Sequence, residues 1–157
     1  MIDAAALIAY VERVHQRTYE AVERLTAELI DSAPRPGEFT AGELVMHIAN
    51  CRLMNAATIA GHGTHYAGHE PPPRATVRVL ERYLEHTSVE TLKTLRAVDL
   101  SRPIPRLDGS QTPAWSTAVG GLIEHEVHHR SQLCDYLSAA GIEPPPLYGL
   151  HAEDLPL

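Results

Sequence analysis

The spacing of the apolar residues constrains this chain most, because it follows a helical period over four long stretches. Side chains that recur every three or four residues fall on one face of a helix, whereas a half-buried strand needs strict alternation. Clusters of proline and glycine separate the stretches, as they do between helices. The sequence therefore predicts an all-α fold, a four-helix bundle in which the two halves of the chain meet in the interior. The predicted helices cover residues 4–30, 40–60, 74–98 and 112–140.

Local signals predict where two of these helices begin and end. Thr40 and Glu43 have the spacing of a capping box at the start of the second helix. In the fourth helix, Thr112 is the predicted N-cap and Pro113 the first helical residue, which is a favoured order. Gly141 is the predicted end of that helix, because glycine commonly follows a helix C-terminus.

The connections leave two local alternatives open. Thr87 and Glu90 also have capping-box spacing, so the third helix is either continuous or broken near Thr87. Asp108 and Gly109 predict a tight turn or a short hairpin before the fourth helix. We expect one domain over residues 1–157, with a core over about 3–141 and an irregular C-terminal tail.

Charge and cysteine content exclude several classes of function. Lys and Arg number 13 against 20 Asp and Glu, a net charge of −7. This balance argues against a basic nucleic-acid surface and against a polybasic membrane patch. No apolar stretch approaches the roughly 18 residues that span a bilayer. The chain has only two cysteines and no cleavable signal. We therefore expect a cytoplasmic protein that binds neither nucleic acid nor membranes.

Three of the ten histidines occupy positions that should point inward. His125 and His129 are four residues apart in the apolar stripe of the fourth helix, so both imidazoles can reach one metal ion. His47 falls between Leu44 and Cys51 on the inward face of the second helix. Three such ligands predict a metal site with an open, catalytic position, and nitrogen ligands suit zinc or nickel as well as iron or cobalt. Alternatively, each imidazole is a core residue with its own hydrogen-bond partner.

The run from His125 to His129 also has the HExxH form of a zinc protease signature, with Glu126 as the general base. Such a protease needs a sheet to hold an extended peptide, and the sequence predicts none, so protease is the least favoured alternative. Glu126 and His128 flank the predicted ligands and are the candidate catalytic residues, in a proton-handling role. Alternatively, both side chains are solvated.

Two further features lie close to His47 in the sequence. The loop histidines His62, His65 and His69 either form a second metal patch, line the mouth of the main site, or are solvated. Cys51 lies one helical turn beyond His47. It is either a fourth metal ligand or a small core residue.

Three segments resemble the DinB-like (damage-inducible) family of four-helix proteins, in a superfamily that includes bacterial thiol-dependent S-transferases. Residues 40–49 carry a histidine in the middle of the second helix. Residues 125–133 match the family pattern H-x-x-x-H-R-G-Q, with Ser131 in place of the glycine. Residues 136–145 match the closing segment, and the resemblance covers about residues 1–150.

The resemblance implies an up-down-down-up bundle, a homodimer, and a metal held by His47, His125 and His129. It also implies a low-molecular-weight thiol as cosubstrate, whose carboxylates Arg52 and Arg130 could hold if they are not simply surface residues. The expected function is that of a metal-dependent enzyme in which an open metal position activates a thiol or water to attack a small electrophile. The alternatives are a non-catalytic metal-binding stress-response protein and a purely structural helical dimer.

Overall fold

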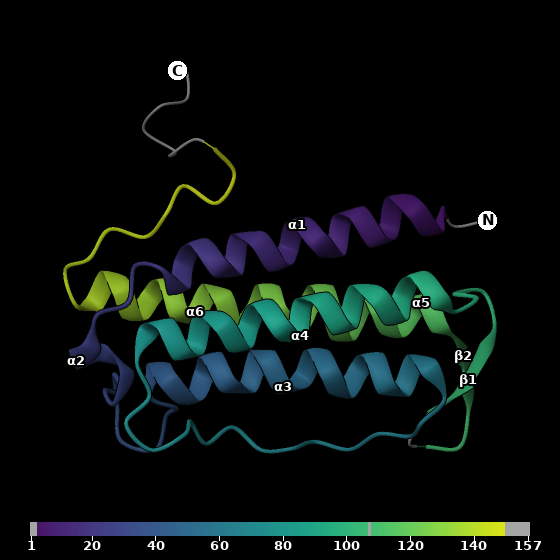
Figure 1. The fold of residues 1–157 in the computed structure, drawn as a ribbon, viewed down its shortest axis with the longest axis horizontal. Helices are drawn as coiled ribbons and strands as arrows, with labels where there is room; N and C mark the ends of the chain where they lie inside the picture. The colour runs from purple at the N-terminus through teal and green to yellow at the C-terminus, as the bar shows by residue number, and fades with distance from the viewer. Residues whose placement is uncertain (1–2, 107, 150–157) are drawn as a thin grey trace.

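Four long helices packed side by side dominate the fold of this computed structural model, which describes residues 3–106 and 108–149 (Figure 1). The first three are α1, α3 and α4. The fourth is one continuous helical run of three parts, α5, η1 and α6. Their bounds are α1 Ala4–Val22, α3 Ala41–Ala60, α4 Val77–Ala97, α5 Ala114–Thr117, η1 Ala118–Glu124 and α6 His125–Ala139.

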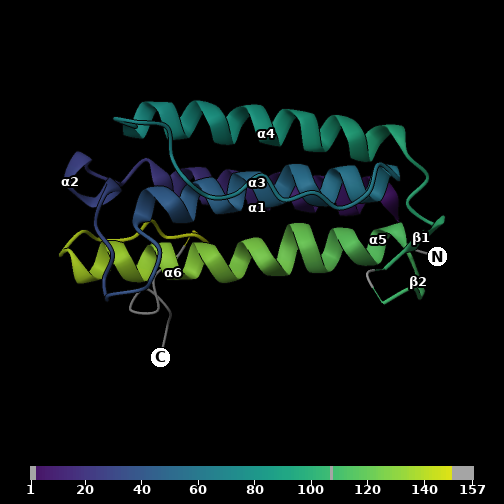
Figure 2. The same cartoon turned by 90° about the horizontal axis from the view of Figure 1, so that it is seen from below.

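The order of the helices around the bundle confirms the predicted up-down-down-up topology. α3 packs on α4, α4 on α1, α1 on α6, and α6 with η1 on α3. The connection over residues 61–76 returns along the length of α3, so α3 and α4 run in the same direction (Figures 1 and 2). As a result, α3 and α6 are neighbours, although they are distant in the sequence.

The first helix is shorter than the periodicity predicts. α1 ends at Val22, and a separate turn, α2 (Ala27–Ile30), follows after Thr26, whose backbone is extended. Arg24 and Leu25 make only turn-type backbone bonds three residues back. Leu25 remains buried. The apolar pattern therefore continues across the break, which explains why periodicity did not reveal it.

The start of the fourth helix also differs from the prediction. Thr112 lies in strand β2 (Gln111–Pro113), and Pro113 is the N-cap rather than the first helical residue. β2 pairs antiparallel with β1 (Pro103–Pro105). This pairing confirms the hairpin alternative. Gly109 in its loop has a φ of +81°, a backbone conformation that favours glycine.

The third helix begins later than predicted, since α4 starts at Val77 after the N-cap Thr76, whereas the remaining predicted helix ends agree with the structure. The capping box is present, since Thr40 Oγ1 accepts from the Glu43 N–H (3.1 Å) and Glu43 Oε2 accepts from the Thr40 N–H (2.7 Å). Gly141 follows α6 with a left-handed φ of +74°. α4 is continuous through Thr87, whose buried hydroxyl donates to the Leu84 carbonyl within the helix instead of capping a new one.

A layer of buried polar residues separates two apolar clusters in the core. One cluster lies toward the α2 end and includes Leu44, Leu84 and Leu133. The other lies toward the hairpin end and includes Val11 and Ile59. The buried polar and charged residues of the intervening layer are His15, Thr18, Arg52, Thr87, Thr91, Glu126 and Arg130.

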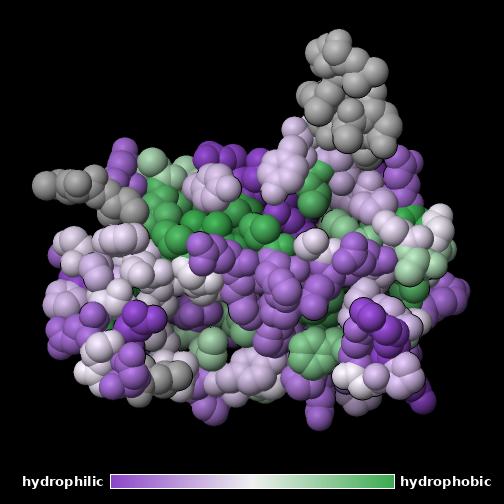
Figure 3. All heavy atoms as spheres, turned by 180° about the vertical axis from the view of Figure 1, so that it is seen from behind, coloured by the Kyte–Doolittle hydropathy of each residue, from purple (hydrophilic) through white to green (hydrophobic). Residues whose placement is uncertain are grey.

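The surface, the helix lengths and the C-terminal residues can be compared with the expected absence of a membrane span and the expected irregular tail. The face seen in Figure 3 is largely hydrophilic, with a hydrophobic patch near the start of α1. Within the described parts of the chain, no helix has both the length and the apolar character needed to cross a bilayer. Residues 142–149 form neither helix nor strand, and the rest of the predicted irregular tail, 150–157, lies outside the described residues.

Candidate metal centre

Three imidazoles meet between α3 and α6. The Nε2 atom of His47 lies 3.2 Å from Nε2 of His125 and 3.1 Å from Nε2 of His129. All three side chains are half-buried. We call these residues the histidine triad. The structure thus brings together the three histidines that the sequence predicts as metal ligands, while ligation itself stays a prediction.

A close approach between α3 and η1 aligns the two helices that carry the triad. Asn55 Nδ2 donates to the carbonyls of Cys51 (2.8 Å) and Gly121 (3.2 Å). A Cβ atom at Gly121 would overlap the Asn55 amide, whereas one at Gly120 would meet open space. η1 is π-helical and leads directly into His125, and such segments often occur at functional sites. Helical periodicity did not reveal this π-helical segment, although the Gly120–Gly121 pair was a visible signal.

Outward hydrogen bonds orient two of the triad imidazoles. With Nε2 facing the centre as the lone-pair nitrogen, His129 Nδ1–H donates to Gln132 Oε1 and His47 Nδ1–H donates to Tyr66 Oη, both at 2.7 Å. Hydrogen bonds of this kind fix the tautomer and ring orientation of metal-binding histidines. Tyr66 and Gln132 were not among the predicted site residues. Gln132 was detectable, because it lies three residues after His129 on the same helix.

The surroundings of the triad lower the pKa values of all three imidazoles. Burial, together with the neighbouring His129 and His125, lowers the pKa of His47 to about 4. Burial also lowers the pKa of His125, assisted by His129, and the pKa of His129, where the bond to Gln132 opposes the shift. At neutral pH the three rings are therefore uncharged, which is the form that binds metals.

The geometry fits a shared cation. In the tautomers described above, the Nε2 lone pairs of His47 and His129 face each other with no proton between them, an arrangement that a common cation would satisfy. Nitrogen ligands placed tetrahedrally at the usual zinc distance lie about 3.3 Å apart. The observed separations of 3.1 and 3.2 Å are close to that spacing. The donor set and its spacing therefore fit a divalent transition metal.

Cys51 lies beside the triad without joining it. Its Sγ is 3.8 Å from His47 Nε2, and burial raises the pKa of the thiol to about 11. Across the described residues, the group whose ligand atoms converge consists of the triad alone. The structure therefore favours the hypothesis that Cys51 is a small buried residue, and not a fourth metal ligand.

The loop histidines do not converge on a second centre within the described residues. His62 and His65 are exposed. His69 packs its ring on Phe39, with ring centroids 4.4 Å apart, and its Nδ1 lies 3.3 Å from Tyr66 Oη. Of the loop histidines, His69 thus lies at the edge of the main site, as one of the sequence alternatives expected.

Glu126 does not take the position that the sequence analysis gave it. Its carboxylate is buried in the polar layer, where it accepts from Arg52 Nε (2.8 Å), Arg52 Nη2 (2.6 Å) and Thr18 Oγ1 (2.6 Å). Burial alone would raise its pKa, but Arg52, His15 and these hydrogen bonds lower it to about 2. Glu126 is therefore neither solvated nor available as a base, which also removes the protease interpretation.

Arg52 and Arg130 are buried rather than on the surface. Arg52 is held by Glu126 and by the Leu84 carbonyl (2.9 Å), and Arg130 donates to the Val14 carbonyl (3.2 Å). Neither guanidinium is free to hold the carboxylates of a cosubstrate at the triad. Both arginines are therefore buried core residues, and the expectation that they hold a cosubstrate or lie on the surface is corrected.

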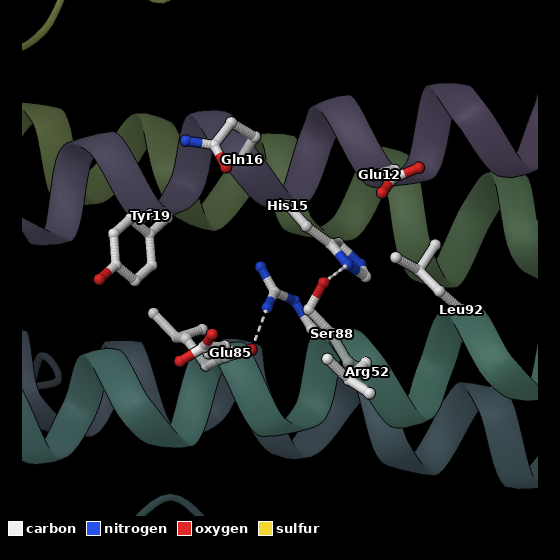
Figure 4. Close-up of a pocket in the computed structure, with 10 residues that line it drawn as sticks. Glu12, His15, Gln16, Tyr19, Arg52, Glu85, Ser88 and Leu92 are labelled. Carbon is white, nitrogen blue, oxygen red and sulfur yellow. Dashed lines mark hydrogen bonds between the residues drawn. The ribbon is translucent and has the colours of Figure 1, made fainter.

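The polar layer is reached from the α1–α4 side by a cavity of about 420 Å³. Figure 4 shows Arg52 between the two helices and His15 bonded to Ser88, at 2.8 Å. Burial and Arg52 lower the pKa of His15 to about 3, against the opposing effect of Glu126. This cavity lies between α1 and α4, whereas the triad lies between α3 and α6.

His128 is exposed, and its ring centroid lies 4.8 Å from that of His129. It is outside the converging group, on the solvent side of α6. Its proton-handling role stays a prediction.

Comparison with known families gives one match that covers nearly the whole chain. A family model described as "DinB family" matches residues 1–156. No curated protein sequence matches the chain.

Solved structures with the same fold come from two Bacillus species. A DinB-like protein from Bacillus cereus aligns with a TM-score of 0.75 and 19% identity, over 88% of this chain and 93% of its own. The DinB-like protein YjoA from Bacillus subtilis aligns with a TM-score of 0.72 and 20% identity, over 89% of this chain and 96% of its own. YfiT from Bacillus subtilis is described as a probable metal-dependent hydrolase with an unusual four-helix bundle topology. It aligns with a TM-score of 0.68 and 18% identity, over 91% of this chain and 92% of its own.

Proposed function

The chain belongs to the DinB family, and from this membership and its histidine triad we propose that it is a metal-dependent enzyme acting on a small electrophile. The observation that carries the proposal is the convergence of three neutral Nε2 atoms, with His47 3.2 and 3.1 Å from its two partners. Three protein ligands leave a coordination position for a reactant.

The proposed ligands are His47, His125 and His129, and the proposed metal is zinc or nickel. A divalent metal bound by these residues would lower the pKa of a thiol or water bound to it, and would so supply a nucleophile at neutral pH. Tyr66 and Gln132 contact the Nδ1 atoms of two of the imidazoles, which leaves the Nε2 atoms facing the proposed metal. Cys51 lies outside the converging ligand atoms, and burial raises the pKa of its thiol.

The first candidate reaction is S-transfer from a low-molecular-weight thiol, which the family resemblance supports. The thiol sulfur forms a bond to an electrophilic carbon while the bond from that carbon to its leaving group breaks. The leaving group takes the electron pair, and the thiol proton passes to solvent. The second candidate is hydrolysis, supported by the fold match to YfiT and its description as a probable metal-dependent hydrolase.

The chain offers a matched pair of variants to test this proposal. His129→Ala removes one triad member, and His86→Ala removes an exposed histidine on α4. Zinc- or nickel-loaded protein is assayed for loss of free thiol with an alkylating electrophile and for ester hydrolysis. We expect metal-dependent turnover that His129→Ala abolishes and His86→Ala keeps. A protein that binds metal but catalyses neither reaction would instead be a non-catalytic metal-binding protein.

We also propose a homodimer, on the basis of the family resemblance. Size-exclusion chromatography with light-scattering detection gives the mass of the protein in solution. A mass near 17.2 kDa would overturn this part of the proposal.

A further inference from the structure

A second cavity adjoins the triad, between α6 and the segment that leads into α3. Its volume is about 500 Å³, and its lining includes His129 and Gln132. The cavity therefore begins at a predicted metal ligand and at the side chain that orients it. The size is within the range of pockets that bind small organic molecules.

Two aromatic rings form fixed walls of this cavity, from Phe39 and Tyr136. Tyr136 Oη donates to the Phe39 carbonyl at 3.0 Å, which ties the segment before α3 to α6. The Phe39 ring also packs on His47, with centroids 5.4 Å apart. Aromatic walls held in this way favour a flat, apolar ligand, because rings stack with little loss of side-chain freedom.

The charges around the cavity disfavour an anion. Arg35 is paired with Glu38, Nη2 to Oε1 at 2.9 Å, although the pair is largely exposed and therefore weak. Asp135 adds a second carboxylate to the lining. The Tyr136 hydroxyl stays neutral, because burial and then Glu38 raise its pKa. The lining thus carries one cation and two carboxylates.

We propose that this cavity, lined by Phe39, Tyr136 and Asp135, is the binding site of the electrophile, and that the electrophile is a small uncharged molecule with a planar aromatic body. The role of the occupant as substrate rests on the proposed function. The preference for a flat neutral ligand rests only on the walls and charges of the cavity, and it does not require the metal.

Phe39 makes a direct test possible, because it is the only phenylalanine of the chain. Incorporation of fluorophenylalanine places a single fluorine NMR signal on the cavity wall. Metal-free and zinc-loaded protein are titrated with naphthylmethanol, with its anionic counterpart naphthoate, and with non-planar cyclohexylmethanol. We expect a saturable shift with naphthylmethanol in both forms. In the metal-free protein, binding of the other two probes should be about ten-fold weaker or more.

Two variants separate the contribution of the charge from that of the wall. Asp135→Lys reverses an exposed charge without disturbing the core, and it should bring naphthoate binding close to that of naphthylmethanol. Tyr136→Ala should abolish saturable binding, whereas Tyr148→Ala, at a residue that is 70% exposed, should not. Equal affinity of the metal-free wild type for naphthoate and naphthylmethanol would overturn the charge argument.

The same fluorine signal distinguishes failure of this inference from failure of the proposed function. The Phe39 ring packs on His47, so Co²⁺ bound at the triad should shift or broaden the signal strongly. A cobalt effect with no saturable response to any naphthalene probe would overturn the cavity proposal and leave the metal site intact. A naphthylmethanol response without a cobalt effect would overturn the metal site and leave the cavity intact.

Discussion

The Nε2 atom of His47 on α3 lies 3.1 Å from the Nε2 atom of His129 on α6. The other ring nitrogen of each is engaged outward, with Tyr66 and with Gln132. With the proton on Nδ1 of both rings, the two Nε2 lone pairs face each other, and a common cation satisfies both.

Gln132→Ala should weaken metal binding by about 10–100-fold, because His129 loses the acceptor that fixes its tautomer. The measurement is the zinc dissociation constant in competition with a chromophoric chelator. Gln16→Ala, at an exposed position on α1, is the matched control. Unchanged zinc affinity in Gln132→Ala would show that the outward bond does not support a ligand.

Gly121→Ala should destabilise the protein by about 1–3 kcal/mol, because the added methyl group overlaps the Asn55 amide that joins α3 to η1. Urea unfolding followed by circular dichroism gives the free energy of unfolding. Gly120→Ala adds the same methyl group one residue earlier into open space. If both variants had the same stability, the close approach would not position the helices.

Glu126→Gln should cost about 3–5 kcal/mol of stability, because it leaves the Arg52 guanidinium buried without its counter-charge. Glu124→Gln, at an exposed position two residues earlier, should change stability by less than about 0.5 kcal/mol. Both values come from urea unfolding at neutral pH. A Glu126→Gln protein of wild-type stability that had lost metal-dependent activity would instead revive a catalytic role for this residue.

His15 should make the protein less stable in mild acid. Its pKa in the folded protein is lowered to about 3 from the model-compound value of 6.5, so the unfolded chain binds the extra proton first. Stability should therefore fall as the pH drops from 6.5 toward 3, by up to about 1.4 kcal/mol per pH unit. A His15→Gln variant, compared with the wild type by urea unfolding at several pH values, should show a shallower slope. If stability fell equally steeply with pH in the wild type and in His15→Gln, His15 would not be the source of the acid sensitivity.

Glu126 should add to this acid sensitivity at lower pH. Its pKa is lowered from 4.5 to about 2 in the folded protein, so its stabilising effect is present above pH 4.5 and is lost as the pH falls toward 2. In Glu126→Gln this part of the pH dependence should disappear. A variant whose stability still fell as steeply below pH 4.5 would show that other groups cause the loss.

The triad could be predicted from sequence because helical spacing alone places His125 and His129 on one face of a helix. His47 could be added because it lies in an apolar stripe of a second helix. The neighbours that orient these rings were harder to find. Tyr66 comes from an irregular connection, and no periodicity indicates where such a segment lies.

The errors arose where a partner lies far away in the sequence. Glu126 was expected near solvent or the metal, yet its partner Arg52 is 74 residues away on another helix. The break after Val22 was hidden because Leu25 keeps the apolar phase. At Glu126 a tertiary contact, rather than the local pattern, decides the structure.

The metal content of the purified protein shows whether the triad holds an ion. Wild type, His129→Ala and His86→Ala are reconstituted with zinc or nickel, freed of unbound metal and measured by inductively coupled plasma mass spectrometry. We expect about one metal ion per chain in the wild type and in His86→Ala, and almost none in His129→Ala. Wild-type protein without metal, or His129→Ala with the wild-type content, would contradict it.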